Sequence, residues 1–201
     1  AQRKSALPSH PAARRLGMTT GFGPERSRVA PRPGRAIYAR VLHLSGKWSK
    51  AEAAFRKSET IQQRCGSAKW ISSLAGYFYC DFLLDGVRGL TGRKLSHHVQ
   101  ELRKRAEKAA RLVTRPVLYL RDIALHKLIL GRIWLLAKNV KRARYDLDEA
   151  VEGLRRASRT DHLPEALVTR AAARWQQQDT AGAKADLEEA CEIADCGPMP
   201  L

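Results

Sequence analysis

Two histidines and two cysteines are the side chains that first invite a metal or redox interpretation. His97 and His98 are adjacent, so on a helix their rings point about 100° apart, and only Glu101 stands at the three- or four-residue spacing from which a further ligand could join them. Cys191 and Cys196 lie five residues apart, too far round a helix for a tight pair. We therefore expect neither a metal site nor a redox site.

Acid–base chemistry would need paired carboxylates. Asp81, Asp85, Asp122 and Asp161 are candidates, but their spacing pairs none of them, and Asp161 has a second use as the N-cap of a helix before Pro164. No Gly-rich phosphate loop of the GxxxxGK type occurs in the chain. We expect no catalytic residue, no cofactor and no enzymatic activity.

Composition describes a chain that folds and attracts anions. The 201 residues are 44% hydrophobic, enough for a buried core, and 37 Lys and Arg against 20 Asp and Glu leave a net charge of +17. Nucleic acid, acidic peptides and lipid headgroups would all suit that charge. Because an excess of Arg over Lys is also typical of GC-rich coding sequences, the charge does not choose among them.

Cysteine usage and hydropathy bear on the compartment. Four cysteines without CxxC spacing favour buried thiols in a reducing compartment. No apolar stretch has the roughly 18 residues of a membrane span, and no secretory signal is evident. We expect a cytoplasmic protein that does not enter the membrane. Because the chain starts at Ala1 and stops just after a helical pattern, we also expect further domains in a longer protein.

The expected helices begin after a basic N-terminal segment. Residues 1–34 carry five prolines and many arginines with Glu25 as the only acid, which predicts a disordered arm. A transit peptide or nucleic-acid tail is an alternative, although dense prolines oppose an amphipathic helix. The helical pattern then predicts eight helices that pair into four hairpins, over 35–45, 48–63, 69–90, 95–113, 117–137, 140–158, 162–177 and 180–195. Thr114, Asp161 and Thr180 are expected N-caps, and Gly197 is expected to end the last helix.

A short pattern repeats at the start of the second helix of three hairpins. It is a turn, then a small residue, then a bulky residue four positions later: Ala51 with Phe55, Ala143 with Leu147, and Ala183 with Leu187. A small side chain lets two helices approach closely, and the bulky one fills the space one turn away.

Upstream of the second unit, Leu130-Gly131-xx-Trp134 resembles the Leu-Gly-xx-Tyr element of tetratricopeptide repeats. The resemblance covers about residues 35–196, within a repeat domain expected over 35–201, and implies an all-α, right-handed solenoid of about four antiparallel hairpins. The 40 residues from Ala143 to Ala183 exceed the roughly 34 of a standard repeat, and Arg170 and Arg174 stand at usually apolar positions.

The amino-acid sequences of two further segments resemble the repeat tails of bacterial multidomain signalling ATPases. These are Phe78-Tyr-Cys-Asp-Phe-Leu-Leu84 and Asp161-His-Leu-Pro164. In such a parent, the resemblance implies that the repeats sense or recruit a ligand protein while a separate domain acts as the switch.

In the register of tetratricopeptide repeats, a groove along the first helices would hold an extended peptide. The resemblance places six residues there: Arg40, His43, Arg88, Arg132, Leu135 and Trp175. Because the planar guanidinium donates paired hydrogen bonds to carboxylates, the expected ligand is an acidic or C-terminal peptide segment of a partner protein. Ordinary solvated arginines are the alternative interpretation of this set.

A second basic concentration lies in the second hairpin, and it consists of Arg93, Lys94, Arg103, Lys104, Arg105, Lys108, Arg111 and Arg115. A solvated outer surface explains it, and the rival is a nucleic-acid-binding repeat protein that uses this hairpin and the basic arm. The exposed aromatic residues of single-strand binders are missing from the pattern.

Overall fold

The structure is a computed structural model, and it describes residues 34–64, 73–87, 89–113, 120–158 and 161–196. Within these ranges the chain is all-α, as predicted, and contains eight helices: α1 (Gly34–Leu44), α2 (Trp48–Arg64), α3 (Ser73–Asp85), α4 (Gly92–Val113), α5 (Leu120–Leu136), α6 (Val140–Arg156), α7 (Leu163–Gln176) and α8 (Thr180–Cys196). The expected arm up to residue 33, Arg88, Arg115, the cap Thr114 and the stop Gly197 lie outside the described residues.

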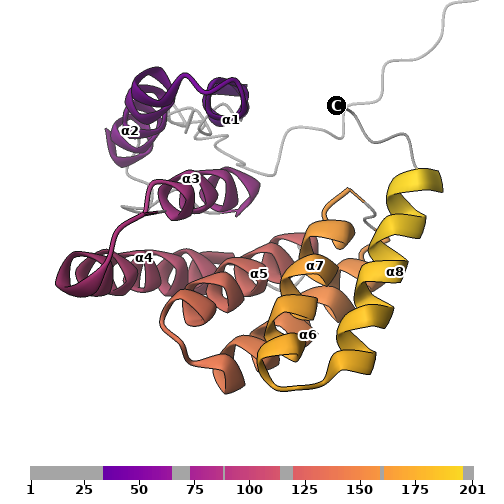
Figure 1. Cartoon of the computed structure of the whole chain (residues 1–201). Coiled ribbons are helices and arrows are strands. Elements are labelled where there is room, and N and C mark those ends of the chain that lie inside the picture. The colour runs from indigo at the N-terminus through magenta and orange to yellow at the C-terminus, as the bar shows by residue number, and fades with distance from the viewer. Residues whose placement is uncertain (1–33, 65–72, 88, 114–119, 159–160, 197–201) are drawn as a thin grey trace, which may run out of the picture.

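Helices adjacent in the sequence pack against each other in pairs (Figure 1). The first helices of the predicted pairs also contact one another. α3 lies against both α1 and α5, and α5 contacts α7. This series, α1, α3, α5 and α7, is called the inner helices below. It brings segments that are far apart in the sequence to one side of the molecule.

Three of the four hairpins share one turn. Gly46, Lys138 and Gln178 have positive φ angles of 70°, 58° and 63°. The residue after each donates its N–H to a carbonyl five positions back, as in Asn139 to Trp134 at 2.9 Å, which is the Schellman way of ending a helix. Each turn then leads directly into the next helix, so it sets the hairpin's register.

The helix that follows begins with an Asx cap in two of these turns. The side chain of Asn139 accepts a hydrogen bond from the N–H of Arg142 at 3.1 Å, and Asp179 accepts one from Gly182 at 3.0 Å. The N-cap of α8 is therefore Asp179, and the prediction of Thr180 as this cap is wrong. The prediction of Asp161 as a cap is wrong as well, because His162 precedes α7 and makes no side-chain cap bond.

The small residues of the repeated pattern are buried as expected. Ala51, Ala143 and Ala183 are at most 4% exposed, and each stands five residues after the positive-φ residue of its turn. Phe55 and Leu147 are fully buried.

Leu187 does not follow the pattern, because it is 46% exposed and the preceding residue, Asp186, points inward instead. The carboxylate of Asp186 accepts hydrogen bonds from Arg170 at 2.6 and 2.9 Å and from Arg174 at 3.0 Å. This carboxylate gives a partner to both arginines, at positions where the resemblance predicted apolar residues.

Gly131 has the role that the sequence pattern assigned to it. A Cβ atom at this position would lie 2.5 Å from Cγ of Leu147, so α5 and α6 touch where a side chain is absent. The prediction that α3 continues to residue 90 is wrong. The helix ends at Asp85, and Gly89, with a φ of 87°, belongs to the turn that leads into α4.

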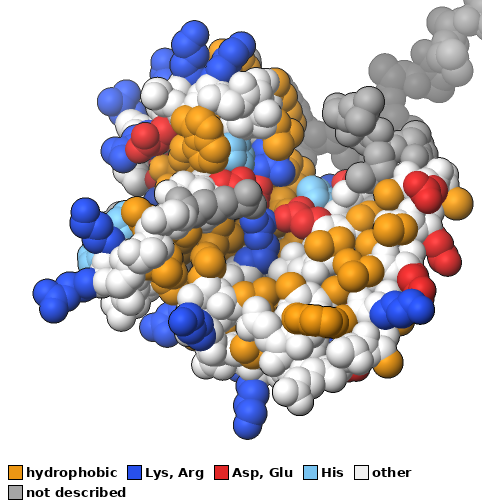
Figure 2. All heavy atoms as spheres, viewed as in Figure 1, with side chains coloured by type: hydrophobic (Ala, Val, Ile, Leu, Met, Phe, Trp, Pro, Cys, Tyr) orange, Lys and Arg blue, Asp and Glu red, His pale blue; other side chains and the backbone are white. Residues whose placement is uncertain are grey.

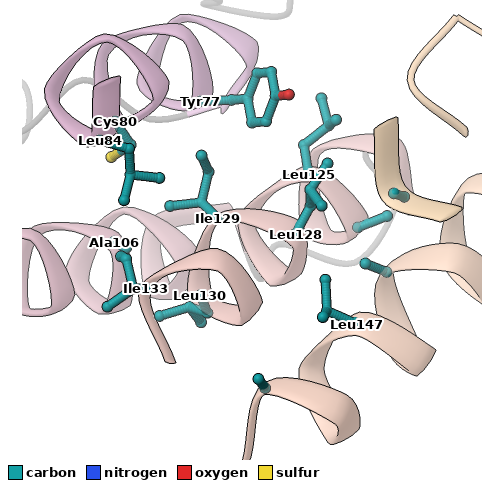
Figure 3. Packing of buried hydrophobic residues seen from close by; sticks show 14 of the residues in the cluster. Tyr77, Cys80, Leu84, Ala106, Leu125, Leu128, Ile129, Leu130, Ile133 and Leu147 are labelled. Atoms are coloured by element: carbon teal, nitrogen blue, oxygen red, sulfur yellow. The ribbon is translucent and has the colours of Figure 1, made fainter. Parts of the chain in front are cut away.

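The main core joins α3 to the later helices. Tyr77 of α3 lies over Leu125, Leu128 and Ile129 of α5, and Leu147 of α6 packs on the opposite side of α5 (Figure 3). A smaller core joins the first hairpin to α3 and consists of Ala39, Leu42, Ala51, Phe55, Tyr79 and Phe82.

Candidate functional site

Charged side chains meet where the inner helices lie together. Figure 2 shows acidic and basic groups gathered in the hollow between α3 and α7. We call this set the inner network: Arg40 and His43 from α1, Tyr77, Asp81 and Asp85 from α3, Arg132 from α5, and Glu165 from α7.

Asp81 is the centre of the inner network. Its side chain is 5% exposed, and its two oxygens accept hydrogen bonds from Arg40 and Arg132. Burial by itself raises the pKa of a carboxyl, but the two guanidiniums outweigh this effect, so the pKa of Asp81 is lowered. Tyr77 and Asp85 stand four residues before and after it, so all three project from one face of α3.

Arg132 connects α5 to both sides. Besides Asp81, its Nη1 donates to Glu165 of α7 at 2.8 Å, and its Nη2 lies 3.8 Å from Asp85. The hydroxyl of Tyr77 donates to the other oxygen of Glu165 at 2.7 Å. Burial and the neighbouring Glu165 raise the pKa of Tyr77 well above its ordinary value, which keeps the hydroxyl a donor. Glu165 is thus the outermost carboxylate of a chain of contacts across three helices.

His43 is a buried, aromatic-flanked member of the network. Its Nε2 lies 3.2 Å from Asp85, its Nδ1 lies 3.1 Å from Arg40, and its ring packs edge-on against Trp48 and Phe82. Burial, followed by the charge of Arg40, lowers the pKa of His43 despite the two nearby carboxylates. The ring is therefore uncharged at neutral pH.

The inner network is acid-rich in a basic chain. It holds three carboxylates, Asp81, Asp85 and Glu165, against two guanidiniums, so its formal charge is −1 with His43 neutral. The chain as a whole carries +17. Arg40 and Arg132 are thus neutralised by the protein itself.

The sequence-predicted groove residues are only partly brought together. Arg40, His43 and Arg132 lie in the inner network, Arg88 is outside the described residues, and Leu135 is half-buried against the main core. Trp175 lies on α7 and is 68% exposed. Sequence reasoning missed Tyr77 and Glu165 altogether and treated Asp81 and Asp85 only as possible catalytic groups. The steps of four residues from Tyr77 to Asp81 and from Asp81 to Asp85 were the signal that these three side chains share one face.

Exposed apolar side chains continue from Glu165 along α7. Val168 is 49% exposed, and Ala172 and Trp175 follow it on the same face, because the steps from Glu165 are three, four and three residues. We call Glu165, Val168, Ala172 and Trp175 the α7 stripe. It combines an aromatic anchor with a carboxylate that is 36% exposed.

One cluster of side chains has the spacing of a metal site, but guanidinium groups of the protein already bind its central carboxylate. His43, Asp81 and Asp85 each place one ligand atom within 4.8 Å of the others. Both oxygens of Asp81 accept hydrogen bonds from guanidiniums, however, and a metal ion would have to displace them. This group therefore supports no metal assignment.

The basic hairpin that suggested nucleic acid is partly neutralised. Arg105 pairs with Glu59 and stacks over Tyr79, and Lys104 pairs with Glu101 at 2.9 Å. Arg103 stacks over Trp134, with its guanidinium carbon 5.4 Å from the ring centroid, and lies 3.7 Å from Glu107. Arg93, Lys94 and Lys108 are exposed on α4.

Buried histidines make the fold sensitive to acid. Burial is the main cause that lowers the pKa values of His43, His126 and His162 below the ordinary 6.5. As the pH falls below 6.5, the unfolded chain takes up these protons before the folded one does, so the free energy of unfolding decreases. We expect the urea midpoint to fall between pH 7.5 and 5.5, well above the range in which Asp81 titrates. His126→Leu, at a 3% exposed position, should make the urea midpoint depend less on pH. A midpoint constant over this range would contradict the assignment.

None of the helices in the described ranges has the length and apolar composition that a membrane crossing needs. No protein-family model matches the chain, and comparison with curated proteins finds no match.

Proposed function

We propose that the chain is a non-enzymatic protein-interaction scaffold, a solenoid of tetratricopeptide type that binds a segment of a partner protein along its inner helices. The α7 stripe carries this proposal, because it presents an exposed aromatic side chain on the same face of α7 as a carboxylate that shares Arg132 with Asp81. The contacts among α1, α3, α5 and α7 support a common surface on which such a segment could lie.

The energetics of the stripe suit a binding anchor. Tryptophan is among the residues that most often dominate interfaces, because burial of its large ring removes much apolar area from water. Val168 and Trp175 are seven residues apart, so their Cα atoms lie about 10 Å apart along the helix axis. Two apolar side chains of a ligand can use both anchors at once.

The inner network determines how an acidic segment could bind. The two guanidiniums already hold carboxylates, so a ligand carboxylate must replace one of these. Glu165 is the one to displace, because it is 36% exposed while Asp81 is 5% exposed. The exchange leaves Arg132 paired and turns Glu165 toward solvent, and it places the ligand next to the apolar part of the α7 stripe.

Fluorescence anisotropy with the full chain tests the proposal. The probes are a labelled 12-residue peptide of alternating Leu and Glu and its counterpart with Lys in place of Glu. We expect the Glu peptide to bind, Trp175→Ala to weaken it at least tenfold, and Glu165→Gln to strengthen it several-fold by releasing Arg132. Tyr145→Ala is the matched control, because Tyr145 is a 52% exposed aromatic on α6.

Two outcomes would contradict this assignment. One is an equal affinity for the Trp175→Ala and Tyr145→Ala variants. The other is a single-stranded oligonucleotide that binds more tightly than either peptide and loses affinity steeply with salt, which would favour the nucleic-acid alternative.

A further inference from the structure

α1 is apolar on both sides, and the described residues cover only one of them. Ala36, Ala39 and Leu42 face the rest of the protein and are at most 7% exposed. The opposite side presents four large apolar residues, which we call the α1 outer face: Ile37 (50% exposed), Tyr38 (57%), Val41 (54%) and Leu44 (70%). Figure 2 shows hydrophobic atoms along this edge of α1. A surface helix normally has one apolar stripe that faces the core and polar residues on the opposite side.

These four side chains form one continuous surface. At about 100° per residue, they span an arc of roughly 120° centred near Val41. The arc is wide enough to contact another helix, and clustered exposed apolar side chains of this kind mark interaction sites. Single exposed apolar residues would need no such explanation.

A groove adjoins this face on the side of α2. It encloses about 570 Å³. Gly34, Arg35 and Tyr38 line it from α1, and Ala53, Ala54 and Lys57 line it from α2. Its floor is thus a tyrosine ring and two alanines, and its rim carries two cations.

The cations of this rim have no acidic partner within the described residues. Arg35 and Lys57 form none of the ion pairs there, and Lys50 stands two turns before Lys57 on the same side of α2. The nearby acids are engaged elsewhere, because Glu52 pairs with Arg56 and Glu59 with Arg105. The surface therefore combines an apolar strip with uncompensated positive charge.

Charge selects among the possible occupants. A second copy of the chain would bring two sets of like charges together, which opposes association. The segment before α1 is itself basic, with Glu25 as its only acid. A partner helix with Glu or Asp beside its apolar stripe satisfies both the strip and the rim.

We propose that the α1 outer face and the adjoining groove bind an acidic amphipathic helix of a partner protein. The mode is helix-in-groove docking, in which apolar residues at steps of three and four enter beside Tyr38 and Val41. Carboxylates on the flank of that helix lie over Arg35 and Lys57. This site shares no residue with the α7 stripe, so it stands independently of the function proposed above.

The test measures binding of two designed helical peptides of 18 residues to the full chain. Both carry Leu at positions i, i+3, i+4 and i+7, and they differ only in having Glu or Lys on the flanks. We expect the Glu helix to bind at least tenfold more tightly than the Lys helix. Val41→Glu should weaken it at least tenfold, and Val41 is exposed, so the fold should persist by circular dichroism.

Charge reversal gives the sharper experiment. The double variant Arg35→Glu, Lys57→Glu should lose the Glu helix and gain the Lys helix. Lys184→Glu, at a 77% exposed position of α8, is the matched control and should change neither affinity. Trp175→Ala should also leave this binding intact while it weakens the peptide bound at the α7 stripe.

Three results would overturn the proposal. The first is equal affinity for the two helices, and the second is a double variant that behaves like Lys184→Glu. The third is a dimer of the unmodified chain in light scattering that Val41→Glu converts to a monomer, which would assign the face to a second copy.

Discussion

Asp81→Ala should lower the free energy of unfolding by about 3 kcal/mol, the lower end of the range for removing one partner of a buried ion pair. The side chain is 5% exposed and is the acceptor that Arg40 and Arg132 share. Without it, Arg40 loses its only strong acidic partner of the network, while Arg132 retains Glu165. Native domains are stable by about 5 to 15 kcal/mol, so the loss is a large fraction of the total.

Urea denaturation followed by circular dichroism measures this effect. Asp148→Ala is the matched control, because its side chain is 45% exposed and pairs with Arg144 at 2.8 Å, and an exposed pair contributes less than about 1 kcal/mol. Asp148 also lies 3.4 Å from Arg170, but Arg170 retains its closer partner Asp186 in this variant. Asp81→Asn should lie between the two, because an amide oxygen still accepts a hydrogen bond while the charge is lost. Equal losses for Asp81→Ala and Asp148→Ala would show that the inner network is not a stabilising centre.

Gly131→Ala should destabilise the protein by about 1 to 3 kcal/mol, because it overpacks the contact between α5 and α6. The added Cβ atom would lie 2.5 to 2.6 Å from two carbon atoms of Leu147, a fully buried side chain that has little room to turn. Replacing an exposed helical glycine by alanine normally raises the free energy of unfolding by about 1 kcal/mol. A decrease at Gly131 would therefore indicate that α5 and α6 touch there.

Gly86→Ala is the control for this substitution. A Cβ atom added at Gly86 would lie 3.4 and 3.7 Å from two backbone oxygens, which are ordinary contact distances. We therefore expect only a small change in the free energy of unfolding. A double-mutant cycle sharpens the test, because Leu147→Ala should cost less in the Gly131→Ala background than in the original chain. Additive effects would show that α5 and α6 are not in contact at Gly131.

The inner network also changes how mutations in the predicted groove must be interpreted. Replacing Arg40 or Arg132 by Glu would put a fourth carboxylate beside Asp81 and Asp85, so loss of peptide binding could follow from loss of folding. Trp175 and Glu165 are better probes, because both are substantially exposed. Binding experiments on this surface therefore begin from α7.

Much of the local structure could be predicted from the order of the residues. The helices and their pairing follow from apolar residues at steps of three and four, because that spacing places them on one face whatever surrounds the helix. Ala51, Ala143 and Ala183 are buried, and Gly131 lies against Leu147, as the repeated pattern indicated. Each of these features depends on a turn or a helix face within a few residues.

Ion pairing and exposure were decided by tertiary structure. Asp81 is 41 residues from Arg40 and 51 from Arg132, and Arg132 is 33 from Glu165, so no local spacing relates them. The sequence predicted that Arg40 and Arg132 bind a ligand carboxylate, whereas the packing of α3 between α1 and α5 places the carboxylate of Asp81 between them. In the same way, the apolar residues of α1 are evident in the sequence, and only the position of α1 at one end of the inner helices leaves Tyr38 and Val41 exposed.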